Sequence, residues 1–378
     1  MNKKKIGYIL YGLIFRIFRT MPVKKGKTVF FMVHNSKFQG NLKYIYKGLQ
    51  QQYPKRDYKI YEKDALLSGS ICKKIKGSVF FYVGLNYHLA TAEYIFLNDN
   101  FMPLSTMHIS KKTKVIQLWH GVGAWKRFGL TTEQDAVTRK AVQEGNKKIT
   151  HLFVSGHRVV PFYEEALGIS KERIYSVGLP VLDFYFSKEK REKARAKIYE
   201  EYPELKGKRV LLYTPTFRKT KEENKQILER FPLDKIKEKL GEEWIILVRL
   251  HPIMKEEKYL LPKGCYEMSD YPNVLALYEV ADVMVNDYSS TMVEYALLHK
   301  PIVLYAYDLE KYDRGFYFSY KEYKPGPIVT DVDSLVQAIK EGKVDEEQRK
   351  RFLALHYDYF DANNTKRVLE ILKDGELL

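Results

Sequence analysis

The stretch VIQLWHGVGAWKRFG, residues 115–129, decides the fold class of this chain because it joins an apolar run to a turn with reactive side chains. The run is typical of a buried strand, and His120 follows where that strand is expected to stop. The stretch WIILVRLHP, residues 244–252, repeats the pattern and places His251 before a proline. In open parallel sheets, ligands bind beyond the carboxyl ends of the strands. The two histidines therefore predict one crevice with chemistry on both walls.

Apolar runs of strand length alternate with helical patterns on both sides of these two stretches. The other runs cover residues 28–33, 94–97, 151–154, 209–213, 282–286 and 301–307, and two helical patterns cover residues 188–201 and 292–299. This alternation predicts an α/β fold with parallel sheets and helical crossovers.

A chain of 378 residues suits two domains of ordinary size. We expect one Rossmann-like domain over residues 28–195 and a second, which includes a terminal helix, over residues 196–378. The boundary is expected near the highly charged stretch at residues 187–209, which is typical of a surface helix that leads into a linker.

Composition argues against several classes of protein. A hydrophobic content of 45% argues against disorder, and two widely separated cysteines argue against a disulfide framework or a zinc site. The net charge of +17 predicts an anionic partner. No zinc finger, RNA-recognition motif or DNA-reading helix is visible, so we expect anionic lipid or phosphate-bearing substrates and no nucleic acid.

The first 27 residues predict a helix that lies on a membrane surface. They contain no acidic residue, and their apolar run at residues 6–15 is too short to span a bilayer. Isoleucines and leucines recur at helical spacing, and Tyr11, Phe15 and Phe18 are expected to widen that apolar face. The basic residues expected to meet anionic headgroups are Lys3, Lys4, Lys5, Arg16, Arg19, Lys24, Lys25 and Lys27. The alternative is an ordinary helix packed on its own domain.

His120 is the candidate general base, because a histidine can take a proton from a hydroxyl near neutral pH. Gly121 would let a substrate approach the backbone closely, and Lys126 and Arg127 could hold a phosphate beside the base. The alternative is a structural histidine that hydrogen-bonds a loop.

His251 and Arg249 are candidates for binding a phosphate. Strand alternation would put both side chains on one side, where the histidine donates a hydrogen bond and the arginine offers its planar fork. Thr216 and Arg218, in the loop after residues 209–213, could form a second phosphate clamp. An ordinary turn is the alternative for either pair.

The segment 283–308 carries the most specific local pattern, a run of polar residues at a strand-to-helix junction. These residues are Asp287, Ser289, Ser290 and Thr291. Free backbone N–H groups and hydroxyls at such a junction can cradle a diphosphate, whereas helix capping explains only one hydroxyl. Thr291 and Glu294 also have the spacing of a capping box. The histidines show no metal-ligand clustering and no P-loop is present, so neither a metal nor a cofactor is expected.

Seven short motifs occur together between residues 115 and 368. They are LWHGVGAWKRFG, GLPVLD, YTPTFR, RLHP, NDYSSTMVEYALLHKPIVLY, YDRGFYF and YFDANNTKRV. In this order they resemble the CDP-glycerol:poly(glycerophosphate) glycerophosphotransferase family of wall teichoic acid synthesis. The resemblance implies a GT-B-like fold, in which two Rossmann-like domains with parallel sheets face a central cleft. It also implies a CDP-polyol donor and metal-independent transfer.

The resemblance also implies roles for residues and partners. His120 is similar to the family's base and His251 to its donor-phosphate histidine, with the acceptor bound by the N-terminal domain and CDP-glycerol by the C-terminal domain. The implied acceptor is an undecaprenyl-diphosphate-linked disaccharide, reached from a peripheral position on the cytoplasmic side of the cell membrane. The six-residue step from His120 to Lys126, and the lack of a long extra N-terminal region, favour a glycerol-phosphate primase. GLPVLD lacks an arginine after its proline, so the role of Asp183 stays open, as do those of Asp313 and Arg314.

Three alternatives remain. A CDP-ribitol or other polyol-phosphate transferase or polymerase, of wall teichoic acid or capsule, differs only in its donor. A GT-B glycosyltransferase would release a nucleoside diphosphate rather than CMP. A noncatalytic protein that binds membranes or nucleic acid would explain the charge but would leave the two histidines without a role.

Overall fold

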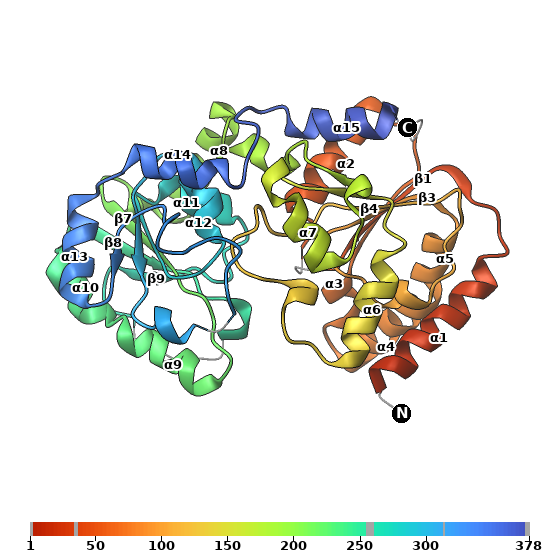
Figure 1. Ribbon diagram of the computed structural model, residues 1–378, viewed down its shortest axis with the longest axis horizontal. Coiled ribbons are helices and arrows are strands. Elements are labelled where there is room, and N and C mark those ends of the chain that lie inside the picture. The colour runs from red at the N-terminus through yellow and green to blue at the C-terminus, as the bar shows by residue number, and fades with distance from the viewer. Residues whose placement is uncertain (1–2, 34–36, 255–260, 313, 375–378) are drawn as a thin grey trace. The chain divides into compact units, whose positions relative to one another are not determined.

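The computed structural model of the protein divides into two compact units (Figure 1). The first contains residues 1–183 and 356–378, and the second contains residues 184–355. The residues that the structure describes are 3–33, 37–254, 261–312 and 314–374. Within them, each unit is built on one parallel sheet of six strands. The predicted α/β fold with two parallel sheets is therefore confirmed.

The first sheet has the strand order β2-β1-β3-β4-β5-β6 and is parallel throughout. Its strands are β1 (Lys24–Met32), β2 (Tyr58–Glu62), β3 (Ala92–Leu97), β4 (Lys114–Gln117), β5 (His151–Phe153) and β6 (Ile174–Tyr175). Phe30 of β1 stacks on its register partner Phe96 of β3 in the core. Because β3 and β4 are neighbours, the residues that follow them share one edge of the sheet.

The helices of the first unit come from both ends of the chain. They are α1 (Lys3–Phe18), α2 (Gly40–Gln52), α3 (Lys63–Leu67), α4 (Ile71–Val79), α5 (Leu85–Ala90), α6 (Ala136–Asn146), α7 (Val160–Leu167) and α15 (Asn364–Asp374). A π-helical turn, Phe80–Gly84, joins α4 to α5. The last helix, α15, lies beside α2 (Figure 1), where Gly48 leaves room for Leu369. The end of the chain thus completes the core of the unit in which the chain begins.

The second sheet has the strand order β12-β11-β10-β7-β8-β9 and is also parallel throughout. Its strands are β7 (Arg209–Thr214), β8 (Trp244–Val248), β9 (Cys265–Glu267), β10 (Val283–Asn286), β11 (Ile302–Tyr305) and β12 (Ile328–Val329). The helices of this unit are α8 (Lys188–Glu201), α9 (Lys221–Arg230), α10 (Leu233–Leu240), α11 (Val274–Val280), α12 (Thr291–Tyr295), α13 (Val332–Glu341) and α14 (Glu346–Ala354). Apolar side chains of α9, α10 and α13 pack with the buried residues of β7 and β8 in one core.

The division between the units differs from the expected boundary at residues 195 and 196. The charged stretch does not act as a linker, because most of it forms α8, which packs on α11. Arg191 and Arg195 of α8 both pair with Glu279, whose side chain is fully buried. A buried carboxylate needs such partners, so this ion cluster binds α8 to the second unit.

The terminal helix α15 belongs to the first unit rather than the second because Asp183 caps it. The Asp183 carboxylate accepts hydrogen bonds from the backbone N–H groups of Asn364 (2.8 Å) and Thr365 (3.1 Å), and from both of their side chains. Arg367 also donates to the Val177 carbonyl (2.9 Å). The stretches GLPVLD and YFDANNTKRV therefore form one joint, which gives Asp183 a structural role.

Helix α1 has two different apolar faces. Tyr11 and Phe15 are buried against the first unit, and a Cβ on Gly12 would lie only 2.7 Å from Thr106. The opposite face is exposed and carries Ile6, Ile9, Leu10, Leu13 and Ile17. The expectation that Tyr11 and Phe15 widen the exposed face is therefore wrong, because their rings fill the core.

Lys27 also differs from the expected basic surface of residues 1–27. It lies in β1, is only 2% exposed and donates to the Thr91 hydroxyl (2.6 Å). Burial lowers the pKa of Lys27 to about 8. Lys27 therefore cannot meet a lipid headgroup. Among the described helices, none combines the length and the apolar character needed to cross a bilayer.

Candidate functional site

His120 stands on a strained corner beyond the carboxyl end of β4. The strand ends at Gln117, and Trp119 has a φ of 36°, in the left-handed region that residues other than glycine rarely adopt. Trp119 is buried, whereas 33% of the His120 side chain is exposed. The corner thus leaves the histidine ring accessible beside a buried tryptophan.

Three polar side chains hold this corner. Gln117 is fully buried, and it accepts a hydrogen bond from the Trp119 N–H (3.1 Å) while donating to the Asp99 carbonyl (3.1 Å). Asn41 donates to the Trp119 carbonyl (3.2 Å). Asp99 follows β3, and its Oδ2 lies 3.4 Å from Nδ1 of His120. The neighbouring strands β3 and β4 therefore bring a carboxylate to the histidine.

The predicted acceptor-side residues lie in the loop after this corner. The Gly121 carbonyl accepts a hydrogen bond from the Tyr163 hydroxyl (3.2 Å), and a Cβ on Gly121 would meet no atom closer than 3.7 Å. Packing alone therefore does not demand glycine here. Lys126 is partly exposed and Arg127 is exposed, so both cations can reach a ligand.

Two residues shortly before α15, His356 and Asp358, contact this loop and the segment after β5. His356 is fully buried, and its Nδ1 accepts a hydrogen bond from the Ala124 N–H (3.4 Å). Asp358 accepts from the backbone N–H of His157 (2.7 Å). Burial lowers the pKa of His356 to about 3, so this histidine is neutral near pH 7 and can act as an acceptor.

His251 lies three residues beyond β8 in the second unit. Its ring packs on Phe217, with 4.4 Å between centroids, and its Nδ1 accepts from the Ile253 N–H (3.3 Å). A neutral imidazole carries its proton on one nitrogen only. This contact therefore puts the proton on Nε2, where it can be donated to a phosphate oxygen.

The Arg249 side chain makes its hydrogen bonds within the protein. Because β8 ends at Val248, strand alternation does not extend to His251. The Arg249 guanidinium donates to the carbonyls of Met268 (2.6 Å) and Tyr271 (2.9 Å). It therefore holds the loop that follows β9.

Arg218 and Asp287 lie in a buried ion network at the carboxyl ends of β7 and β10. The Arg218 side chain is 9% exposed and donates to Asp308 (2.8 and 3.0 Å) and to Asp287 (3.0 Å). Burial alone would lower the pKa of Arg218, but the two carboxylates raise it above its usual value. The Tyr288 hydroxyl also donates to Asp308 (2.7 Å). One guanidinium thus faces two carboxylates, so Arg218 offsets the charge of Asp287 only in part and is already engaged inside the protein.

The hydroxyl groups predicted to bind the donor lie around this network. The Thr216 N–H donates to Asp287 (2.8 Å), and the buried Thr216 hydroxyl has no hydrogen-bond partner among the described residues. The Ser289 N–H donates to the side chain of Asn286 (2.9 Å), and Ser290 is exposed. The structure thus brings Thr216 and Asp287 together at the start of the segment that leads into α12.

The expected capping box between Thr291 and Glu294 is wrong. Thr291 is the first residue of α12, and its hydroxyl interacts with the side chains of Asn286 (2.8 Å) and Thr214 (3.1 Å). Glu294 instead accepts a hydrogen bond from the Tyr185 hydroxyl (3.2 Å). Burial raises the pKa of Glu294 to about 7.

Five residues that position these groups were not predicted as site residues from the sequence. They are Asn41, Asp99, Gln117, Asn286 and Asp308. Four of them are polar residues within or just after a predicted strand, which is a usable signal, but their partners depend on the order of strands in the sheet. Arg314 is partly buried, and Asp313 lies outside the described residues.

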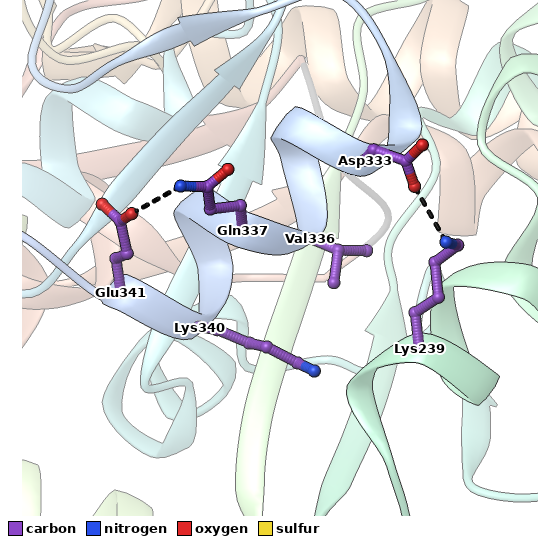
Figure 2. A pocket seen from close by; sticks show the side chains of 6 residues that line it. All are labelled: Lys239, Asp333, Val336, Gln337, Lys340 and Glu341. Carbon is purple, nitrogen blue, oxygen red and sulfur yellow. Dashed lines mark hydrogen bonds and ion pairs between the residues drawn. The ribbon is translucent and has the colours of Figure 1, made fainter.

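No predicted site residue lines the pocket shown in Figure 2. This hollow of about 380 Å³ lies between α10 and α13, where Lys239 pairs with Asp333 (2.8 Å) and Gln337 donates to Glu341 (3.0 Å). Lys239 and Asp333 are already paired with each other, and the hollow is open at the surface, so it gives no reason to expect a ligand. Among the described residues, no three His, Cys, Asp or Glu side chains gather as metal ligands.

Two parallel six-stranded sheets with reactive side chains beyond their carboxyl ends define a GT-B-like α/β protein. The chain belongs to the CDP-Glycerol:Poly(glycerophosphate) glycerophosphotransferase family, whose model matches residues 13–373. This confirms the resemblance seen in the sequence. Its fold is similar to that of the wall teichoic acid polymerase TagF, with a TM-score of 0.80 and 23% identity over 97% of this chain and 93% of that one.

Curated relatives include enzymes named for different polyols. The chain is 30% identical to a teichoic acid poly(ribitol-phosphate) polymerase of Bacillus spizizenii, over 97% of this chain and 59% of the relative. It is also 30% identical to the ribitol-phosphate polymerase TarK of Staphylococcus aureus, over 96% of this chain and 71% of the relative. A glycerol-phosphate primase of Bacillus spizizenii is 30% identical over 76% of this chain and 77% of the relative. The chain thus spans only part of the length of these relatives.

Proposed function

We propose that the protein is a teichoic acid glycerol-phosphate primase. In this function it transfers glycerol phosphate from CDP-glycerol to an undecaprenyl-diphosphate-linked disaccharide and releases CMP. Membership of the glycerophosphotransferase family supports the reaction type, and the likeness to a curated teichoic acid glycerol-phosphate primase supports glycerol phosphate as the transferred group.

The observation that carries the proposal is that His120 lies beyond the carboxyl edge of the first sheet and His251 beyond that of the second. His120 pairs with a carboxylate, which suits a base, whereas His251 accepts a backbone N–H at Nδ1, which suits a ring that donates to a phosphate from Nε2. The buried Thr216 hydroxyl without a partner adds a polar group that a donor could satisfy.

The proposed transfer needs one general base and hydrogen-bond donors to the donor phosphates. His120 takes the proton of an acceptor hydroxyl while that oxygen attacks the β-phosphorus of CDP-glycerol. The new phosphorus–oxygen bond forms, the bond to the CMP oxygen breaks, and CMP leaves with its electron pair. His251 and the hydroxyls of Ser289 and Ser290 stabilise the charge on the donor phosphates. Positioned donors of this kind can contribute roughly 100- to 1,000-fold each.

The test uses the purified chain with CDP-glycerol and a lipid-diphosphate-linked disaccharide. CMP release together with a product heavier by one glycerol phosphate is expected. A ladder of products would indicate a polymerase. Release of a nucleoside diphosphate from a nucleotide sugar would indicate a glycosyltransferase instead. Absence of CMP release from any CDP-polyol would reject the proposed reaction type.

A CDP-ribitol transferase is the second candidate, favoured by one specific observation. Two relatives that match almost the whole of this chain at 30% identity are named as ribitol-phosphate polymerases. Parallel assays with CDP-glycerol and CDP-ribitol distinguish the two candidates. A kcat/KM at least tenfold higher for CDP-ribitol would replace glycerol with ribitol in the proposal.

We also propose that the protein attaches peripherally to the cytoplasmic side of the cell membrane. The exposed apolar face of α1 supports this, and α4 together with the π-helical turn that follows it adds a second stripe at helical spacing. That stripe consists of Ile71, Ile75, Val79 and Val83, which are 44% to 78% exposed. Three lysines and no acid accompany it on α4. Tyr11 of α1 packs on Phe81, in the turn after α4, so the two apolar faces belong to neighbouring elements. Apolar side chains beside lysines match an anionic lipid surface.

A further inference from the structure

We propose that Asp99 is the positioning residue of the base, holding His120 in the tautomer that accepts a proton at Nε2. This inference rests on the proposed function, because it assigns a role within the transfer reaction. The observation behind it is the distance of 3.4 Å between the Asp99 carboxylate and Nδ1 of His120.

The position of Asp99 is fixed by its surroundings. Its backbone carbonyl accepts a hydrogen bond from the buried Gln117 side chain, and its Oδ1 accepts from the Asn100 N–H (2.6 Å). The next residue back, Asn98, is 5% exposed and accepts from the Val33 N–H (2.9 Å). The carboxylate therefore sits on a segment tied to both neighbouring strands of the sheet.

The position of His120 is fixed by the same glutamine. Gln117 accepts from the Trp119 N–H with its oxygen and donates to the Asp99 carbonyl with its nitrogen. One buried amide thus spans the two backbone segments that carry the carboxylate and the histidine. Asn41 holds the Trp119 carbonyl from another side. A pair held in this way has a preset geometry, which is what positioning for catalysis requires.

The chemical consequence follows from the distinct roles of the two ring nitrogens. A carboxylate beside Nδ1 favours the tautomer with the proton on Nδ1, and this leaves the lone pair on Nε2. Nε2 then takes the proton of the acceptor hydroxyl as the new oxygen–phosphorus bond forms. The resulting imidazolium is stabilised by the Asp99 charge until it returns the proton to solvent. Asp99 keeps its own charge throughout.

The first experiment reads the tautomer without any substrate. Nitrogen-15 NMR of the full chain, with the His120 signal identified by its loss in His120→Ala, should show a protonated Nδ1 and an unprotonated Nε2 in the neutral ring. In Asp99→Asn that preference should reverse, because an amide can donate to Nδ1. A wild-type His120 with its proton on Nε2 would overturn the proposal. This readout is independent of whether CDP-glycerol is the donor.

The second experiment measures transfer. Asp99→Asn should lower kcat by roughly 10- to 1,000-fold while the KM for the CDP-polyol stays within about threefold, and Asp99→Glu should recover part of the loss. In a His120→Ala background, Asp99→Asn should change the rate by less than about twofold, because the two residues act as a unit. Glu93→Gln, at the opposite end of β3, is the matched control. If Asp99→Asn lowered kcat equally in the wild type and in His120→Ala, Asp99 would act independently of His120, and the proposal would be wrong.

Discussion

At Trp119 the backbone adopts a conformation that costs about 1–3 kcal/mol, and the surrounding hydrogen bonds offset it. Gln117 and Asn41 hold the N–H and the carbonyl of this residue. The effect is to expose the ring of His120 next to a buried indole. The sequence indicated the histidine because it follows an apolar run. It could not indicate the strain, which Asn41 of α2 helps to hold, or the neighbouring Asp99, which depends on β3 and β4 being adjacent.

Replacing His120 is the most direct test of the base. His120→Ala should keep the fold and the binding of donor but lower the transfer rate by roughly 100- to 10,000-fold. CMP release under saturating donor measures this. His157→Ala is a suitable control, because His157 also follows a strand of the first sheet and is largely exposed. A His120→Ala enzyme within about threefold of wild type would exclude the role.

His251 and the serines before α12 should act on the donor instead. His251→Ala should lower kcat/KM for the CDP-polyol by roughly 10- to 1,000-fold, and so should the joint replacement of Ser289 and Ser290 by alanine. The physical reason is the loss of hydrogen bonds to phosphate oxygens. A donor titration of the initial rate measures the change, with Ser334→Ala on α13 as the control. Unchanged donor kinetics in both variants would place the phosphates elsewhere.

Helix α1 shows why a sequence pattern can assign a helix but not its orientation. Apolar residues surround most of α1, so helical spacing alone could not separate the face that packs from the face that is exposed. The structure separates them through Gly12, where α1 approaches Thr106 closely, and through the ring of Tyr11. Removal of the first 27 residues should therefore also open the core of the first unit, which makes truncation a poor test of membrane binding.

Substitutions on the exposed faces test membrane binding without opening the core. Replacing Leu10, Leu13 and Ile17 by serine, or Ile71, Ile75 and Val79 by serine, should lower the fraction that sediments with anionic vesicles by at least about tenfold, because insertion depends on buried apolar area. Leu261→Ser, an exposed apolar residue of the second unit, is the control. Activity on a soluble acceptor should stay within about twofold in all three proteins. Sedimentation equal to that of wild type would mean that these faces do not bind the membrane.

The hydrogen bonds between Asp183 and the start of α15 should contribute to the stability of the first unit. Asp183→Ala should reduce the free energy of unfolding by about 1–2 kcal/mol or more, because it removes a cap and leaves buried donors without an acceptor. Urea unfolding followed by circular dichroism measures the loss. Asp345→Ala removes a local and exposed cap from α14, so it should cost less. An Asp183→Ala protein as stable as wild type would contradict the structural role of this aspartate.

For the whole molecule, the sequence predicted two parallel sheets correctly but placed the last helix in the wrong unit. The runs that became β4 and β8 were visible because buried parallel strands are apolar along their length. The return of α15 to the first unit was not visible, since it depends on Asp183 meeting Asn364, which lies far along the chain. The same distance in sequence hid the contact between His356 and the loop after His120. Long-range polar contacts have no local periodicity, and this is why they escape a reading of the sequence.

The burial of His356 makes the stability of the first unit depend on pH. Burial lowers the pKa of His356 to about 3, below the value of about 6.5 expected in the unfolded chain. The unfolded state therefore binds more protons between these values, so the contribution is full above about pH 6.5 and is lost as the pH falls toward 3. Between pH 7 and pH 5 this one histidine should lower the free energy of unfolding by about 2 kcal/mol. Urea unfolding at both values measures the difference, which should shrink by a similar amount in His356→Gln. If that variant does not fold, an NMR titration of the wild type decides the matter, because a His356 ring that becomes protonated near pH 6.5 in the folded protein would contradict the argument.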